Sequence, residues 1–397
     1  MTNKLLPSLW LVIFIVGLPQ FSETVYTPSL PEIANALRTS ESMAEYTLTI
    51  YLFGFAIGTL FWGKLSDKIG RKPCVLAGLF VFVIGSIGCY FSDTIAMLMI
   101  SRFIQAFGGS IGSVIGQAIC RDAFYGPDLG RVYSIVSSAL AFFQVIGPII
   151  GGVIAEHFGW SSIFLFLTVN ALILSFFVAR YLPETHYPEL RKHIPISKVV
   201  LGMIQDRKVI GFGIIVGGCN GMSFSYLAEG PFYLIELLGL NPSQYGFSFI
   251  SLAMGAMLGG LASRKLHDYR ESKVIMGYGL IILLSGCAML SSIMVIHTYI
   301  PIHRSWLIYC VIISQTINMF GMSVVTSNAL VLALADYKWC IGTASSIFGF
   351  GYYFIISLCT LFMGFLHNGT LLPMPLYFLT IALLMQITQK IMISRRK

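Results

Sequence analysis

The sequence predicts an all-α integral membrane protein of twelve transmembrane helices in two halves of six. Apolar runs of about 18–31 residues recur along the whole chain, and at about 1.5 Å per residue each can cross a hydrocarbon core of about 30 Å. Hydrophobic residues make up 56% of the 397 residues and charged residues 11%, against about 25% charged residues in typical soluble domains. Together these observations exclude an ordinary soluble domain.

The order of the apolar runs predicts the two halves. The first six expected spans cover residues 9–26, 45–63, 73–90, 95–120, 132–154 and 160–182. The last six cover residues 209–238, 245–263, 274–297, 305–335, 342–366 and 372–391. A polar, proline-bearing stretch separates them. We therefore expect an N-terminal six-helix bundle over 1–182, a cytoplasmic linker over 183–208 and a C-terminal bundle over 209–397.

The basic residues predict the orientation of the chain. Lysine and arginine gather in loops that alternate spans would place on one side of the membrane, notably 64–72, 180–208 and 264–273. Lys4 and the terminal Arg395, Arg396 and Lys397 fall on the same side. Such a bias marks the cytoplasmic side, so both termini are expected in the cytoplasm and the protein in the inner (plasma) membrane. The net charge of +8 is then explained by topology and contact with anionic lipid, not by nucleic acid.

Several kinds of chemistry have no support in the sequence. The eight cysteines form no CxxC pair, and the seven histidines lie in expected loops or at span edges without an HExxH motif. The sequence therefore predicts no metal site, disulfide or cofactor. No nucleophile–base constellation predicts an enzyme, so no catalytic residue is expected. No Walker A pattern points to ATP as an energy source.

A charged loop joins the second and third expected spans. Residues 63–72 read GKLSDKIGRK, in which Gly63 and Gly70 permit tight turns and Asp67 is an anion among cations. The pattern G-x-L-S-D-[KR]-x-G-R-[KR] resembles the signature loop of the major facilitator superfamily. The resemblance implies that Asp67 and Arg71 take part in gating, not in substrate binding.

Spans four and five carry further motifs of the same kind. Residues 102–109 read RFIQAFGG and resemble the family's R-x-x-Q-G-x-G motif, with Ala106 where glycine is usual. Span four ends in Arg121-Asp122, as in the family's drug exporters, and the resemblance places Arg121 in the gating motif with Gly63, Asp67, Gly70 and Arg71. Residues 147–152 read GPIIGG and resemble the motif of its antiporters; the residues concerned are Gly147, Pro148, Gly151 and Gly152. A packed, kinked helix crossing is the structural alternative for this motif.

The first span adds a resemblance to one branch of the superfamily. Residues 23–33 read ETVYTPSLPEI and look like the D-x-Y-L-P-A-L-P-x-I segment of the bicyclomycin-resistance (Bcr/CflA) drug–proton antiporters. Thr24 occupies the usual aspartate position, and Glu23 stands one place earlier. Because one residue turns a side chain by about 100° on a helix, the role of that aspartate does not pass directly to Glu23.

The charges inside spans nominate a proton-coupling site. A carboxylate within a span costs about 2.5–3.5 kcal/mol on insertion scales, so it normally faces a partner or a water-filled cavity. Counted from opposite membrane faces, the depths of Glu23 and Arg102 add up to about one bilayer, so the two side chains can lie level. An exchange of partners would let Glu23 alternate between protonated and ionised forms. A permanent structural ion pair is the alternative.

Glu229 in span seven is the third coupling candidate, because Pro231 can open the helix beside it. A solvated position near the outer interface is its alternative, and Glu45 is expected at the interface. Polar and aromatic side chains inside spans are candidates for lining a substrate cavity, with helix packing as the alternative for each. They are Tyr26, Gln105, Gln117, Asn220, Tyr226, Tyr233, Gln315 and Asn318.

The family resemblance and the buried charges together predict proton-coupled, alternating-access efflux of amphipathic or cationic small molecules. The expected partners are the substrate, protons and membrane lipid. A dedicated exporter of a metabolite such as a siderophore is the alternative, since the usual aspartate is missing. A membrane sensor or scaffold without transport is the alternative from another class.

Overall fold

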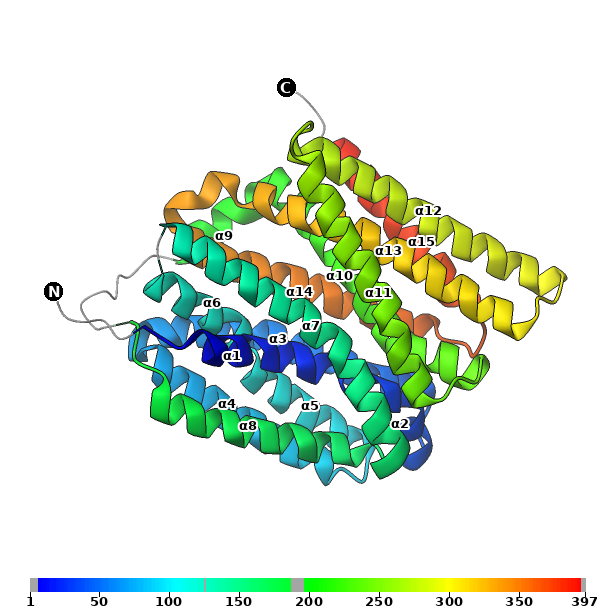
Figure 1. Ribbon diagram of the computed structural model, residues 1–397, viewed down its shortest axis with the longest axis horizontal. Helices are drawn as coiled ribbons and strands as arrows, with labels where there is room; N and C mark the ends of the chain where they lie inside the picture. The colour runs from blue at the N-terminus through cyan, green and yellow to red at the C-terminus, as the bar shows by residue number, and fades with distance from the viewer. Residues whose placement is uncertain (1–5, 125, 187–195, 394–397) are drawn as a thin grey trace. The chain divides into compact units, whose positions relative to one another are not determined.

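The computed structural model describes residues 6–124, 126–186 and 196–393, and all its regular structure is helical (Figure 1). The all-α prediction is confirmed. Lys4 and the terminal residues Arg395, Arg396 and Lys397, which support the expected cytoplasmic termini, lie outside the described residues.

The chain divides into two compact units. The first comprises Met1–Thr39 and Thr47–Ile194, and the second comprises Ser40–Tyr46 and Pro195–Lys397. The short segment 40–46 therefore clusters with a unit that is remote from it in sequence. Within the predicted linker, residues 187–195 lie outside the described part, and the stretch after them forms the helix α9 (Ile196–Gln205).

The helical structure of the first half has two interruptions, one just after the first expected span and one inside the fourth. The helices are α1 (Leu9–Thr24), α2 (Leu30–Ala36), α3 (Glu41–Ile69), α4 (Arg71–Tyr90), α5 (Ile95–Gly109), α6 (Ile111–Ala123), α7 (Gly126–Phe158) and α8 (Ser161–Tyr181). A 3-10 turn, Thr27–Ser29, separates α1 from α2, because Pro28 has no backbone N–H to continue the α-helical ladder. Span four likewise forms two helices that meet at Ser110.

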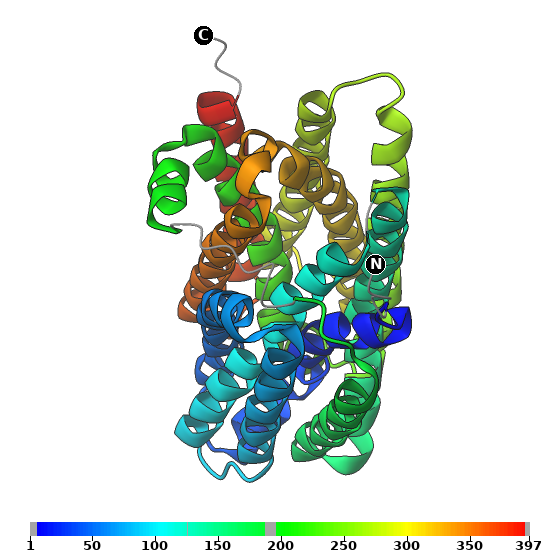
Figure 2. The same ribbon diagram turned by 90° about the vertical axis from the view of Figure 1, so that its left-hand side faces the viewer.

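The helices of the second unit match the predicted spans more continuously. They are α10 (Arg207–Pro231), α11 (Pro242–Leu266), α12 (Ser272–Tyr299), α13 (Arg304–Ala333), α14 (Ile341–Leu366) and α15 (Pro373–Thr388). A π-helical segment, Phe232–Leu237, extends α10 beyond Pro231. Helix α12 packs along α13, and the yellow-green and yellow-orange ribbons lie side by side in Figures 1 and 2.

Eleven helical segments of the described residues are long and apolar enough to cross a membrane. The remaining expected span is α7, in which residues Phe142–Phe158 form a shorter apolar helix among the residues searched. The helical spans are confirmed, and α7 extends several residues beyond both ends of the predicted run.

Glycines bring α1 and α7 into close contact. A Cβ atom added to Gly151 would overlap the carbonyl group of Val25, and one added to Gly147 would overlap Thr24 Oγ1. Helix α7 continues through Pro148, and Gly152 is buried. Small residues allow membrane helices to approach closely, so this motif packs α7 onto the end of α1.

We expect Gly151→Ala to lower the free energy of unfolding by about 1–3 kcal/mol, the usual cost of overpacking. The added methyl group collides with main-chain atoms, which cannot move aside as a flexible side chain would. Thermal unfolding in detergent measures the effect. The matched control is Gly351→Ala in α14, whose Cβ would meet nothing within 4 Å. Equal melting temperatures for the two variants would contradict the close α1–α7 contact.

Candidate functional site

The charged loop forms a compact polar node around Arg71. Its Nη1 atom lies 2.7 Å from Asp67 Oδ1 and donates to Ser66 Oγ at 2.7 Å, while Nε donates to Asp122 Oδ2 at 2.9 Å. Gly70 adopts φ = 105°, a conformation that favours glycine, and Gly63 lies within α3. Asp67 and Arg71 thus form a direct ion pair. At the end of span four, Asp122 contacts Arg71, whereas the sequence nominated its neighbour Arg121.

Glu184, which follows the C-terminal end of α8, completes this node. Its carboxylate accepts hydrogen bonds from the backbone N–H groups of Arg71 at 2.9 Å and Lys72 at 3.2 Å. These are unsatisfied donors in the first turn of α4, where an anion is also favoured by the helix dipole. The loop motif alone does not signal this partner, because Glu184 lies 113 positions away in sequence.

Arg102 occupies a second charged site, in the interior of the first unit. The residue is fully buried, and its guanidinium carbon lies 3.8 Å from the ring centroid of Tyr26 and 4.1 Å from that of Tyr51. Nη1 donates to Gln105 Oε1 at 2.6 Å, and Gln105 Nε2 donates to Ser86 Oγ at 2.8 Å. Aromatic faces and one amide therefore hold the cation in an apolar interior.

Glu23 lies within electrostatic reach of Arg102 but forms no direct hydrogen bond with it. It is 1% exposed, and neither carboxylate oxygen has a hydrogen-bond partner among the described residues. The Nε and Nη2 atoms of Arg102 also lack hydrogen-bond partners there. The structure thus brings both nominated residues into one cluster, with Tyr26 fixed by a 3.2 Å contact between its hydroxyl and Thr47 Oγ1.

The third charged site lies in the second unit and surrounds His367. Its Nδ1 atom is 2.9 Å from Glu229 Oε2 and 3.2 Å from Glu45 Oε1, and its Nε2 atom is 2.7 Å from Glu41 Oε2. Glu45 and Glu229 are 0% and 1% exposed. Helix α10, the start of α3 and the end of α14 thus enclose both carboxylates, so neither has the solvated side chain that an interfacial position would give it.

The carboxylates determine the protonation of His367, which lies just beyond α14. Burial lowers the pKa of its imidazole, but the interactions with the neighbouring carboxylates of Glu229 and Glu45 outweigh burial and raise the pKa to about 10. The Phe232 ring packs against the imidazole with 5.6 Å between centroids. The sequence predictions missed Glu41, Glu45 and His367 as a site. A helical spacing of four between the two glutamates was the only local signal.

The other nominated polar residues lie in both units, and most of those in the second unit bond to neighbouring groups. Tyr233 donates to the Leu371 carbonyl at 2.9 Å, and Asn220 donates to the Val216 carbonyl of its own helix at 2.9 Å. Asn318 donates to Gln315 at 3.3 Å within α13, and the buried Tyr226 hydroxyl has no hydrogen-bond partner among the described residues. Gln117 is half-buried in α6 of the first unit.

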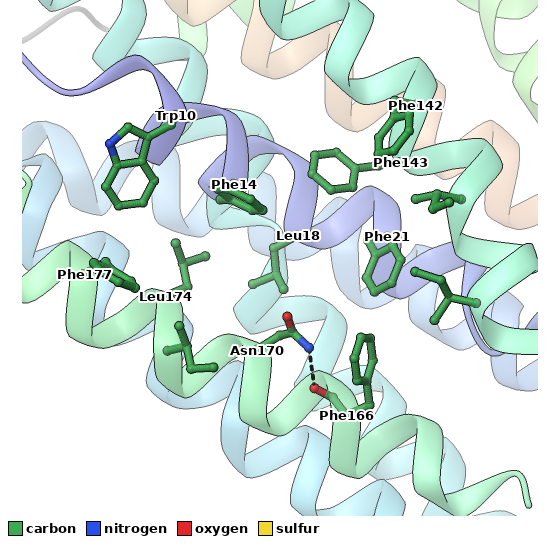
Figure 3. A pocket seen from close by; sticks show the side chains of 13 residues that line it. Trp10, Phe14, Leu18, Phe21, Phe142, Phe143, Phe166, Asn170, Leu174 and Phe177 are labelled. Carbon is green, nitrogen blue, oxygen red and sulfur yellow. Dashed lines mark hydrogen bonds between the residues drawn. The ribbon is translucent and has the colours of Figure 1, made fainter. Parts of the chain in front are cut away.

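An apolar cavity of about 530 Å³ lies between α1, α7 and α8. Figure 3 shows Phe14 and Phe21 of α1 between the phenylalanines of α7 and the side chains of α8. Asn170 is a polar residue of the lining, and its Nδ2 atom donates to the Phe166 carbonyl at 2.8 Å. The surface offered to a ligand is therefore almost wholly apolar and rich in aromatic rings.

Comparisons with known proteins agree along most of the chain. The family described as Major Facilitator Superfamily matches residues 9–360. A Rickettsia felis protein described as an uncharacterized transporter is 35% identical over 369 residues, 91% of this chain and 90% of that protein. A bicyclomycin resistance protein homolog of Haemophilus influenzae is 27% identical over 337 residues, 84% of this chain and 82% of that protein.

Solved structures share the fold, among them that of a sugar transporter. It is the partially occluded inward open conformation of the xylose transporter XylE from E. coli, with a TM-score of 0.72 over 95% of each chain. At 14% sequence identity, this likeness shows the fold alone.

The Gln105 amide is the hydrogen-bond acceptor on which the Arg102 cation depends. We expect Gln105→Leu to lower the free energy of unfolding by about 1.5–3 kcal/mol, as for other hydrogen bonds to charged groups. Ser86→Ala removes only the outer bond of the network and should cost about 1 kcal/mol. Denaturant or thermal unfolding in detergent compares the two variants. A Ser86→Ala loss as large as that of Gln105→Leu would show that Arg102 does not depend on Gln105.

Proposed function

Since the chain belongs to the major facilitator superfamily, we propose that it is a transporter that exports amphipathic compounds in exchange for protons. The family that the loop motif predicts is confirmed. The chain is a multi-pass membrane transporter and not an enzyme. We further propose that it lies in the inner membrane with both termini in the cytoplasm. Alternating access would carry the substrate across.

The observation that carries the proposal is the unpartnered carboxylate of Glu23 in an apolar interior. An ionised carboxylate there costs several kcal/mol unless a cation meets it, whereas the protonated form carries no charge. Arg102 and a cationic substrate can each supply the missing positive charge. Proton loss and substrate arrival are therefore coupled at Glu23, which is the requirement for exchange.

Two further observations support amphipathic substrates. Tyr26 and Tyr51 stack on the Arg102 cation in the cluster that contains Glu23, so this part of the interior already holds a cation by aromatic rings, which bind cations without strict geometry. The apolar cavity between α1, α7 and α8 supplies dispersion contacts for a hydrophobic ligand. The name of the Haemophilus relative, a bicyclomycin resistance protein homolog, agrees with drug export.

An inward proton gradient can supply the energy. A membrane potential contributes about 2.3 kcal/mol for each charge moved across 100 mV. Glu229 is the second carboxylate that we nominate for substrate contact, in the second unit. Asp67 and Arg71 are proposed to act in gating, and Gly147, Pro148, Gly151 and Gly152 to hold α1 against α7.

We expect tetraphenylphosphonium to release protons from the purified protein in weakly buffered detergent, and Glu23→Gln to abolish this release. The amide cannot give up a proton but retains the size of the side chain. Glu236→Gln, at an exposed glutamate of the π-helical segment, is the matched control and should release protons as wild type does.

Binding of tetraphenylphosphonium without proton release would contradict exchange at Glu23. Absence of both binding and release would favour the dedicated metabolite exporter, for which a Thr24 at the usual aspartate position is the supporting observation. A protein that moves no solute in liposomes would favour the sensor or scaffold.

A further inference from the structure

We propose that Glu45, Glu229 and His367 form a binding site for one divalent transition-metal ion of the zinc class, with Glu41 orienting the histidine. The site lies within the second unit and shares Glu229 with the proposed function, whereas proton exchange is proposed at Glu23 in the first unit. The sequence predicts no metal site, because its ligands come from three segments that no motif connects.

The ligand atoms are already close enough to share an ion. Nδ1 of His367 lies 2.9 Å from Glu229 Oε2 and 3.2 Å from Glu45 Oε1, and one ligand atom of each residue lies within 4.8 Å of the others. Zinc bonds to nitrogen and oxygen are about 2.0–2.2 Å long, which places tetrahedral ligand atoms about 3.4 Å apart. Both distances to Nδ1 are thus within about half an ångström of this spacing, and a movement of at most about 1.4 Å between the two carboxylate oxygens completes the coordination.

The Glu45 carboxylate is the independent sign of a missing cation. Its side chain is 0% exposed, and neither oxygen accepts a hydrogen bond from the described residues. It nevertheless faces the Nδ1 edge of the imidazole and lies beside Gly364, where an added Cβ would approach Oε2 to 3.3 Å. The bundle thus buries a carboxylate beside a ring nitrogen that is already hydrogen-bonded to Glu229.

Glu41 occupies the position of an outer partner. A metal-bound histidine almost always donates its other ring N–H to a carboxylate, which fixes the tautomer and the ring orientation. Glu41 Oε2 lies 2.7 Å from Nε2, on the opposite edge of the ring from Glu45 and Glu229. With Nε2 protonated and bonded to Glu41, the Nδ1 lone pair points at the two buried carboxylates.

Charge balance favours a divalent ion. Two buried carboxylates and a neutral imidazole carry a charge of −2, which a divalent cation neutralises, whereas an imidazolium alone supplies only +1. One nitrogen and two carboxylate ligands suit zinc or manganese better than calcium or magnesium, which take oxygen ligands. The ion would connect the start of α3 to α10 and the end of α14.

Titration of purified full-length protein with ZnCl₂ at pH 8 by calorimetry tests the proposal. The alkaline pH is chosen because the ion must displace the imidazole proton, and the affinity tag must contain no histidine. We expect one equivalent to bind the wild type, His367→Gln and Glu45→Gln to weaken binding by about 100-fold or more, and Glu41→Gln by about 10–100-fold. Excess MgCl₂ should not compete.

Two controls separate this site from adventitious binding and from the export site. His303→Gln, at an exposed histidine, and Glu23→Gln should bind ZnCl₂ as wild type does. Visible absorption of bound cobalt reports the coordination directly, even if a variant is less stable. Wild-type protein without stoichiometric zinc binding, or unchanged binding in His367→Gln and Glu45→Gln, would overturn the proposal. Proton release by tetraphenylphosphonium in metal-free buffer would be unaffected by either outcome.

Discussion

A charge inside an apolar helical bundle must be stabilised by ion pairs, hydrogen bonds or aromatic contacts from its neighbours. The helix packing described for this transporter depends on these interactions. Arg71 is met by Asp67 and Asp122, near the ends of α3 and α6. Arg102 is met by aromatic faces and the Gln105 amide. The polar residues of α3, α4 and α5 that appear isolated in sequence are therefore packed into local networks, each of which constrains where its helices can lie.

Close helix packing provides the positions that these networks need. The glycines of α7 allow main-chain contact with the end of α1, just where Glu23, Thr24 and Val25 lie. Gly108 and Gly85 similarly bring α4 and α5 together beside Gln105. Because a Cβ atom at any of these glycines would separate the helices, the position of the Glu23 carboxylate depends on residues that never touch it. Motif glycines and buried charges are thus two parts of one arrangement.

The apolar pattern of the sequence predicted the helices well, but it could not predict polar contacts between residues that are distant in sequence. The spans follow from composition and length, because in lipid the backbone polar groups must be satisfied within each helix. The Arg71 loop follows from one local motif. The break at Ser110 and the helix α9 within the linker carry no strong local signal. The His367 cluster joins residues 138 positions apart, so only the folded chain brings them together. Glu45 was assigned to the interface because a helix start usually lies there, whereas tertiary packing buries it.

The two buried carboxylate sites differ in a way that separates their roles. Glu229 and Glu45 face an imidazole that is itself fixed by Glu41, so a positive charge can be held there permanently. Glu23 faces a guanidinium whose hydrogen bond goes to Gln105 and whose faces are covered by Tyr26 and Tyr51. Arg102 is thus engaged before Glu23 ionises, and a substrate cation need not displace a formed ion pair to reach the carboxylate. A site that exchanges its occupant requires such an unpaired group, whereas a site that retains an ion requires converging ligands. By this criterion Glu23 is suited to exchange and the His367 cluster to retention.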